Sequence, residues 1–185
     1  MTGQYREGMR VVSGSARGRP LRAEVPATIR PTTDRVKESM FDILGSLGGV
    51  VDLDVLDVFC GSGALGIEAL SRGANSVTFV DADPRALECA KQNLLAVGLD
   101  LDAARFVRAT LPGWVAPEVD LVFADPPYGE VDAALVLAGI SADLVVFESR
   151  DELGAIEGWR PLRERRYGTT LVTVLTRPDD EDVAE

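Results

Sequence analysis

The stretch Leu56-Asp-Val-Phe-Cys-Gly-Ser-Gly-Ala-Leu-Gly66 decides the fold. Its apolar first half predicts a strand, and its glycines then follow the spacing G-x-G-x-x-G at the start of the helical segment 64–71. Glycine lets the backbone turn tightly and approach a ligand closely, and a helix N-terminus favours a negative group. The stretch therefore predicts a strand–turn–helix unit that binds a nucleotide-containing cofactor.

Short apolar segments alternate with helical segments on either side of this stretch. We expect strands at 53–59, 76–80, 105–108, 119–124 and 144–148, and helices at 34–47, 64–71, 84–97 and 131–140. Residues 162–167 and 169–176 flank Gly168 and predict a hairpin, so one strand near the sheet edge should run antiparallel. The alternation predicts an α/β fold whose mostly parallel sheet is covered on both faces.

The two ends of the chain depart from this pattern. Residues 9–12 and 20–25 predict short strands around a Gly-rich loop, so we expect a small β-hairpin within an N-terminal extension at 1–27. We expect one domain at 28–178, which begins with the linker 28–33, where Thr33 is placed to cap the first helix. The acidic tail at 179–185 is expected to be disordered and solvated.

Composition limits the chemistry available. The chain has 185 residues, two cysteines and no histidine, which argues against a disulfide framework, zinc sites and hydrolytic triads. No uncharged run approaches a membrane span and the start of the chain is polar and charged, so we expect a cytoplasmic protein. The net charge of −11 argues against nucleic acid, but residues 1–38 carry +4, so we expect RNA contacts there.

Two carboxylates near the glycines narrow the choice of cofactor. Asp81 follows Gly61 by 20 residues, a spacing typical of the carboxylate that binds ribose hydroxyls in dinucleotide and S-adenosylmethionine sites. Asp57 precedes the glycines, where it would attract the amino group of a methionine moiety and repel a pyrophosphate. These features favour S-adenosylmethionine, while a dinucleotide site and a turn without a ligand stay open.

The segment Asp125-Pro-Pro-Tyr128 supplies a second pocket at the end of another strand. Asp125 can accept hydrogen bonds from an amine, and proline geometry holds the Pro126 carbonyl in place as a second acceptor. Tyr128 offers a flat face on which a base can stack. The alternative is a simple turn, because Asp and Pro favour turns. The functional interpretation predicts a pocket for an exocyclic amine on a planar ring.

These motifs resemble those of class I amino-methyltransferases, and the similarity extends over nearly the whole chain. The glycine stretch and the 125–128 segment are generic to such enzymes. The block Arg30-Pro-Thr-Thr-Asp-Arg-Val-Lys-Glu38 is similar to the most distinctive part of a narrower group, the RsmD-like bacterial 16S rRNA (guanine-N2) methyltransferases. Arg10-Val-Val-Ser-Gly14 and Arg17-Gly-Arg-Pro-Leu21 look like the hairpin of that family.

The resemblance implies a Rossmann-like, seven-stranded sheet in the order 3-2-1-4-5-7-6 with strand 7 antiparallel. It implies S-adenosyl-L-methionine as methyl donor, with no metal. The implied substrate is the exocyclic N2 of one guanine of 16S rRNA, position 966, within a 30S subunit or an assembly intermediate. The enzyme is expected to act as a monomer.

The motifs and the resemblance together give the expected site residues. We expect catalysis from Asp125, Pro126, Pro127 and Tyr128. We expect cofactor binding from Asp57, Gly61, Ser62, Gly63, Asp81, Ala82, Thr110 and Thr33. We expect RNA binding from Arg10, Arg17, Arg19, Arg22 and Arg35.

The residues alone leave three alternatives. A DNA adenine-N6 or cytosine methyltransferase could build its pocket from the same 125–128 segment, although 185 residues leave no room for an inserted target-recognition domain. A dinucleotide-dependent oxidoreductase could use Gly61, Gly63 and Asp81. A non-catalytic RNA-binding or assembly factor could have kept the fold.

Overall fold

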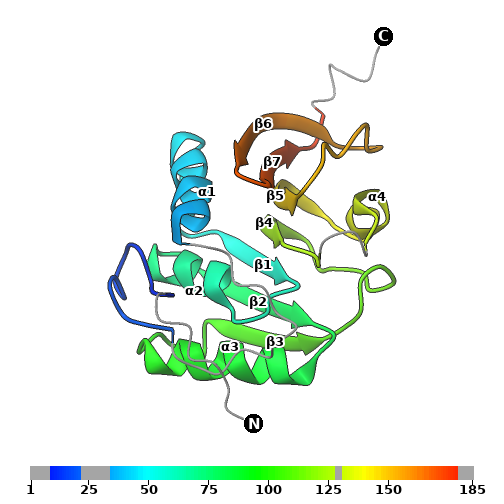
Figure 1. The fold of residues 1–185 in the computed structure, drawn as a ribbon. Helices are drawn as coiled ribbons and strands as arrows, with labels where there is room; N and C mark the ends of the chain where they lie inside the picture. The colour runs from blue at the N-terminus through cyan, green and yellow to red at the C-terminus, as the bar shows by residue number, and fades with distance from the viewer. Residues whose placement is uncertain (1–8, 22–33, 128–130, 179–185) are drawn as a thin grey trace.

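The computed structural model of the chain describes residues 9–21, 34–127 and 131–178. Its centre is a seven-stranded sheet in the order β3-β2-β1-β4-β5-β7-β6 (Figure 1). The parallel strands are β1 (Asp54–Val58), β2 (Ser76–Asp81), β3 (Ala104–Arg108), β4 (Val119–Ala124) and β5 (Ala142–Ser149). β7 (Thr170–Thr176) pairs antiparallel with both β5 and β6 (Arg160–Tyr167). The expected strand order and the antiparallel strand are confirmed.

The helices follow the predicted pattern. They are α1 (Asp34–Ser46), α2 (Ala64–Ser71), α3 (Pro84–Ala96) and α4 (Ala133–Leu137). Proline at the first position and a carboxylate cap start α3, because the Asp83 side chain accepts a hydrogen bond from the Arg85 N–H. Within the described residues, no helix has the length and apolar character of a membrane span.

The helix expected at 131–140 is shorter in the structure, where α4 covers only Ala133–Leu137. The Asp132 side chain caps its start by accepting from the Ala134 N–H. Beyond its end, Gly139 lies so close to a loop that an added Cβ would be 2.8 Å from the Trp114 carbonyl oxygen. The Gly139 carbonyl accepts a hydrogen bond from the Ala116 N–H at 2.9 Å. Pairing with this loop takes the chain out of the helix.

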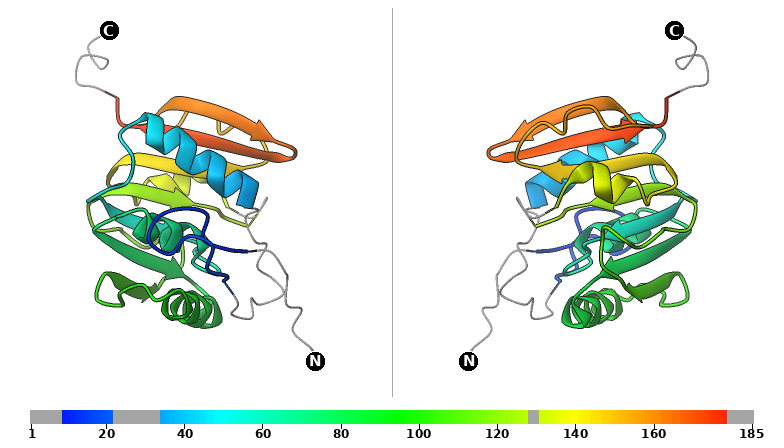
Figure 2. Two further views of the ribbon diagram at one scale, coloured as in Figure 1. Left: turned by 90° about the vertical axis from the view of Figure 1, so that its left-hand side faces the viewer. Right: turned by 90° about the vertical axis from the view of Figure 1, so that its right-hand side faces the viewer.

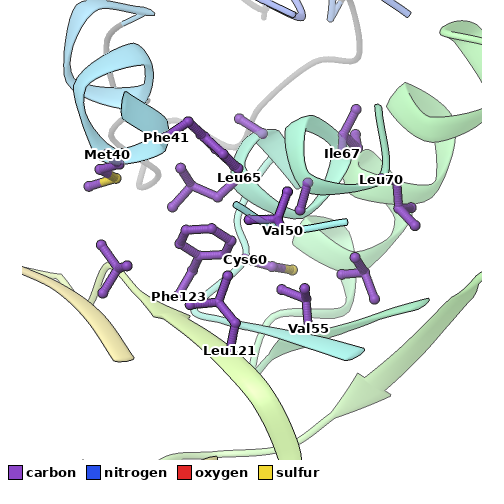
Figure 3. Packing of buried hydrophobic residues seen from close by; sticks show 14 of the residues in the cluster. Met40, Phe41, Val50, Val55, Cys60, Leu65, Ile67, Leu70, Leu121 and Phe123 are labelled. Atoms are coloured by element: carbon purple, nitrogen blue, oxygen red, sulfur yellow. The ribbon is translucent and has the colours of Figure 1, made fainter. Parts of the chain in front are cut away.

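The two faces of the sheet are covered differently (Figure 2). Side chains of α1, α2 and α3 share one apolar cluster with one face, which we call the helical face. Phe41 of α1 and Phe123 of β4 meet there with ring centroids 5.3 Å apart, beside Leu65 of α2 (Figure 3). The opposite face is covered by α4 and by loop residues that include Leu111 and Trp159. We expected helices on both faces of the sheet, but on the second face much of the cover comes from loops.

Within residues 9–21, the two arms of the N-terminal hairpin pair at an antiparallel bridge between Arg10 and Pro20. Three backbone hydrogen bonds join the arms, from the Val11, Leu21 and Gly18 N–H groups to the Arg19, Met9 and Val11 carbonyls. The backbone N–H groups of Val12 and Ser13, just beyond this pairing, donate to the Glu68 carboxylate of α2, at 2.7 and 2.9 Å. The hairpin strand expected at 20–25 lies mostly outside the described residues, as do the linker 28–33 and the tail 179–185. The described part of the hairpin is therefore short and is fastened to α2.

Candidate active site at the strand ends

The carboxyl-terminal ends of β2, β1 and β4 lie side by side at one edge of the sheet, and each carries an aspartate. β1 pairs in parallel register with both neighbours, so the three strands end level with one another. The charges of Asp125 and Asp81 both act on the Asp57 carboxyl. We call these three residues, Asp57, Asp81 and Asp125, the strand-end cluster. The topology thus brings together carboxylates that lie far apart in the sequence.

Asp57 lies deepest in this cluster. It is 2% exposed, and its Oδ2 accepts a hydrogen bond from the Gly66 N–H in the first turn of α2, at 2.9 Å. Burial raises the pKa of the Asp57 carboxyl well above its ordinary value, and the charges of Asp125 and Asp81 raise it further against the Gly66 bond. A bound cation would oppose these effects. The contact with a methionine amino group stays a prediction.

The glycine-rich loop has the geometry that its sequence predicts. Gly61 and Gly63 adopt left-handed φ angles of 52° and 76°. Gly66 serves close packing of α2 on the sheet, because an added Cβ would be 2.4 Å from the Phe79 ring. Phe59, which precedes the loop, has a φ of 60°. That conformation costs on the order of 1–3 kcal/mol in a non-glycine residue and is frequent at functional sites.

Asp81 joins the glycine-rich loop to the start of α3. Its Oδ2 accepts from the Gly61 N–H at 3.1 Å, and its Oδ1 accepts from the Asp83 N–H at 2.9 Å. A carboxylate has about four acceptor positions. Asp81 can therefore shape the loop and still accept hydrogen bonds from ribose hydroxyls.

Asn93 holds the same loop from α3, and the sequence reasoning missed it. Its side chain is fully buried, and its Nδ2 donates to the Ser62 carbonyl at 3.0 Å. Ser62 is itself buried, and its Oγ lies 4.0 Å from the Met9 Sδ of the N-terminal segment. A lone Asn on the buried side of a helix was the available signal. Ser62 of the loop is thus held between α3 and the N-terminal segment.

The remaining expected cofactor residues lie around the rim of the site. Ala82 is exposed, and its carbonyl accepts from the Arg108 Nε at 3.3 Å. Thr110 is exposed just beyond β3, where the Ala109 N–H donates to the Asp81 carbonyl at 3.2 Å. Thr33 lies outside the described residues.

The structure describes three of the four residues that are expected to form the amine pocket. Asp125 is half-buried, Pro126 is buried and Pro127 is exposed, all directly after β4. Tyr128 lies outside the described residues, so its stacking role stays a prediction. Asp125 lies at the same sheet edge as the glycine-rich loop, which is the juxtaposition that the sequence predicted.

An ionic group between α1 and α2, with Lys37 and Glu68 buried at its centre, was not predicted. Lys37 of α1 and Glu68 of α2 are 1% and 0% exposed, and the Lys37 Nζ lies 3.5 Å from the Glu68 Oε2. The Lys37 Nζ also donates to the Arg10 carbonyl at 2.5 Å and lies 3.6 Å from an Asp34 carboxylate oxygen. The Arg72 Nε donates to the Glu68 carboxylate at 2.8 Å. We call Asp34, Lys37, Glu68 and Arg72 the anchor cluster. One signal was available, since Glu68 is the only charged residue in the helix 64–71.

The expected RNA-binding arginines have different surroundings. The Arg10 side chain is 68% exposed, and its Nε lies 3.8 Å from Asp34. Arg17 and Arg35 are exposed. The Arg19 guanidinium donates to the Val97 carbonyl at the C-terminal end of α3, so this side chain also fastens the N-terminal segment. Arg22 lies outside the described residues.

The carboxylates and the loop backbone of the site fit a cationic, adenosine-containing cofactor. Three carboxylates near a glycine-rich loop favour a positive ligand and disfavour a pyrophosphate. Asp81 retains acceptor capacity for a ribose, and the loop backbone is open to close approach. Among the described residues, no group of histidine, cysteine and acidic side chains could hold a metal ion.

Solved structures share this architecture. A putative methyltransferase from Escherichia coli aligns with a TM-score of 0.77 and 32% identity, over 92% of this chain and 98% of that one. A hypothetical protein from Thermus thermophilus aligns with a TM-score of 0.72 and 30% identity, over 91% and 99% of the two chains.

Sequence comparison points to the same group. The Bacillus subtilis protein named putative rRNA methyltransferase YlbH is 43% identical over 66% of this chain and 68% of its own length. Ribosomal RNA small subunit methyltransferase D of Escherichia coli is 38% identical over 65% of this chain and 60% of its own length. A family model described as Conserved hypothetical protein 95 matches residues 9–176. The chain therefore belongs to this RsmD-like family.

Proposed function

We propose that this protein is an S-adenosylmethionine-dependent methyltransferase that modifies the exocyclic N2 of a guanine in small-subunit rRNA. The observation that carries the proposal is the strand-end cluster, in which Asp125 shares a sheet edge with the glycine-rich loop and the Asp57 and Asp81 carboxylates. The names of the similar proteins support rRNA as the substrate. Position 966 of 16S rRNA is the target that the family resemblance suggests.

The reaction requires the protein mainly to position the methyl donor and the substrate amine. S-adenosylmethionine supplies the methyl group when bound. The guanine N2 lone pair is delocalised into the ring, so the amine is a poor nucleophile. Asp125 and the Pro126 carbonyl would accept hydrogen bonds from its two N–H groups and orient the nitrogen, and Asp125 would take the released proton, directly or through water. Positioning of this kind contributes up to ~7–11 kcal/mol in the best intramolecular cases.

The base must leave its helix or loop to reach this pocket. Tyr128 would then stack on it, a contact worth roughly 1–3 kcal/mol. The extension at 1–27 would contact RNA phosphates through its arginines, and the anchor cluster fastens its described part to α2. The acidic remainder of the chain favours a 30S particle with basic proteins on its surface as the substrate. We propose a cytoplasmic enzyme that acts as a monomer.

A methyl-transfer assay tests this function. The protein is incubated with labelled S-adenosylmethionine and naked 16S rRNA, assembled or partly assembled 30S particles, or DNA, and the product is hydrolysed to nucleosides. We expect label in N2-methylguanosine from the RNA or the particles. Label confined to DNA bases, or none in any substrate, would contradict the proposal.

A further inference from the structure

A second acidic residue, Glu148, occupies the position beside Asp125 on the neighbouring strand. β4 and β5 pair in register up to Ala124 and Phe147. Glu148 is the next residue of β5, and Asp125 directly follows the end of β4. Phe123 and its partner Val146 both face the helical side of the sheet. Residues two positions further along a strand return to the same face. Glu148 therefore lies on the face and at the edge where the amine pocket is expected.

The Glu148 side chain is buried. It is 5% exposed, and its Oε1 lies 3.3 Å from the Thr170 Oγ1 at the start of β7. Thr170 is also buried. Burying a carboxylate is costly unless N–H or O–H groups compensate it. The Thr170 hydroxyl is one such group, and a substrate N–H in the neighbouring pocket would be another.

The edge of each candidate base shows what this carboxylate would select. Guanine carries an N1–H donor next to its N2 amine. Adenine and cytosine carry a lone pair, on N1 or N3, next to their amines. A carboxylate beside the amine acceptor accepts the guanine N1–H and repels the lone pair of the other two bases. The 125–128 segment alone would accept all three amines.

We propose that Glu148 determines the choice of base by accepting the N1–H of the target guanine, while Asp125 and the Pro126 carbonyl hold its N2. This inference rests on the proposed function and adds the residue that makes the site specific for guanine. Sites built to hydrogen-bond a substrate donor can reject an analogue that lacks it by up to ~10⁴–10⁵-fold.

RNA with 2-aminopurine at the target position tests the inference, because this base keeps the exocyclic amine and replaces the N1–H with a lone pair. We expect the wild-type kcat/KM to fall on the order of 100-fold or more relative to guanine. For Glu148→Gln, whose amide can donate to a lone pair, the ratio of the 2-aminopurine to the guanine rate should rise toward one. Equal methylation of both bases by the wild-type protein, or an unchanged ratio in Glu148→Gln, would overturn the inference.

Thr170→Val is the matched control, because it removes the hydroxyl beside Glu148 and keeps the carboxylate. It should keep the wild-type preference for guanine, and a loss as large as that in Glu148→Gln would show that packing sets the preference. Cofactor binding by each variant reports whether the protein is folded. If Glu148→Gln does not fold, the wild-type comparison of the two bases still decides. If the wild-type protein leaves the guanine itself unmethylated, the proposed function fails rather than this inference.

Discussion

Two groups of charged side chains, each with a buried carboxylate that contacts or belongs to α2, are organised in opposite ways. In the anchor cluster, the Glu68 carboxylate accepts hydrogen bonds from the backbone N–H groups of Val12 and Ser13. It also accepts from the Arg72 guanidinium and lies beside the Lys37 ammonium. Negative charge is met by positive charge and by N–H donors within the protein.

The strand-end cluster shows the opposite arrangement. Asp57 accepts a hydrogen bond from the Gly66 N–H, but the neighbouring charges that act on it, Asp125 and Asp81, are both negative. Burial and like charge both disfavour the ionised form of a carboxyl group. The comparison teaches that the anchor cluster serves the structure, whereas the strand-end cluster is suited to a cation from outside.

The largest effect should come from removing Asp125, the carboxylate that we expect to accept hydrogen bonds from the substrate amine. We expect Asp125→Ala to lower kcat for methyl transfer by ~10²–10⁴-fold, the usual contribution of a positioned acid or base. The cofactor dissociation constant should change little. Single-turnover rates with labelled S-adenosylmethionine measure the first quantity, and calorimetric titration measures the second.

Asp143→Ala is the control for this variant, because Asp143 is an exposed aspartate near the start of β5, at the opposite edge of the sheet. It should keep the wild-type rate. Methyl transfer by Asp125→Ala at the rate of Asp143→Ala would remove Asp125 from the mechanism.

Breaking the anchor cluster should instead affect stability. We expect Glu68→Ala to lower the free energy of unfolding by about 3–5 kcal/mol, because it leaves the Lys37 charge poorly compensated and frees the N–H groups of Val12 and Ser13. Chemical denaturation measures this change. Glu88→Ala, on the exposed side of α3, should change it by about 0.5 kcal/mol or less. Similar values for the two variants would show that the anchor cluster is not structural.

The sequence was most informative where the determinants are local. The helix cap at Asp83 and the left-handed glycines Gly61 and Gly63 depend on neighbouring residues, and their roles could be read from spacing. The strand order was also predicted, through resemblance. The same reasoning placed Asp57, Asp81 and Asp125 at one sheet edge, because parallel strands end together.

The sequence was least informative where distant segments meet. Lys37 looks like an ordinary surface charge of a helix, and although Glu68 stands out in its apolar helix, only tertiary packing shows that the two are buried against each other. The hydrogen bonds from the Val12 and Ser13 N–H groups to Glu68, which fasten the N-terminal segment to α2, could not be read from either segment alone. Glu148 is equally ordinary in the sequence until the register of β4 and β5 places it beside Asp125.

The central claim is that Asp57 and Asp81 of the strand-end cluster bind a cationic methyl donor, and Asp57 provides its most direct test. Because the pKa of Asp57 is raised above the ordinary 3.8, its carboxyl in the free protein gains a proton as the pH falls from neutrality, before an exposed aspartate would. A cationic ligand favours the ionised form, so its affinity should fall over that same pH range. The stability of the free protein has the opposite sign, since the buried charge costs stability as the pH rises through the raised pKa.

The measurement is calorimetric titration of the wild-type protein and Asp57→Asn with S-adenosylmethionine, at pH values from neutrality down toward the ordinary pKa of an aspartate carboxyl. Both proteins are also titrated with NAD at neutral pH. We predict that the wild-type protein binds S-adenosylmethionine more weakly as the pH falls, that Asp57→Asn binds it weakly with a flatter pH dependence, and that NAD gives no saturable heat. Tight binding of NAD, or the same pH dependence in both proteins, would contradict the account.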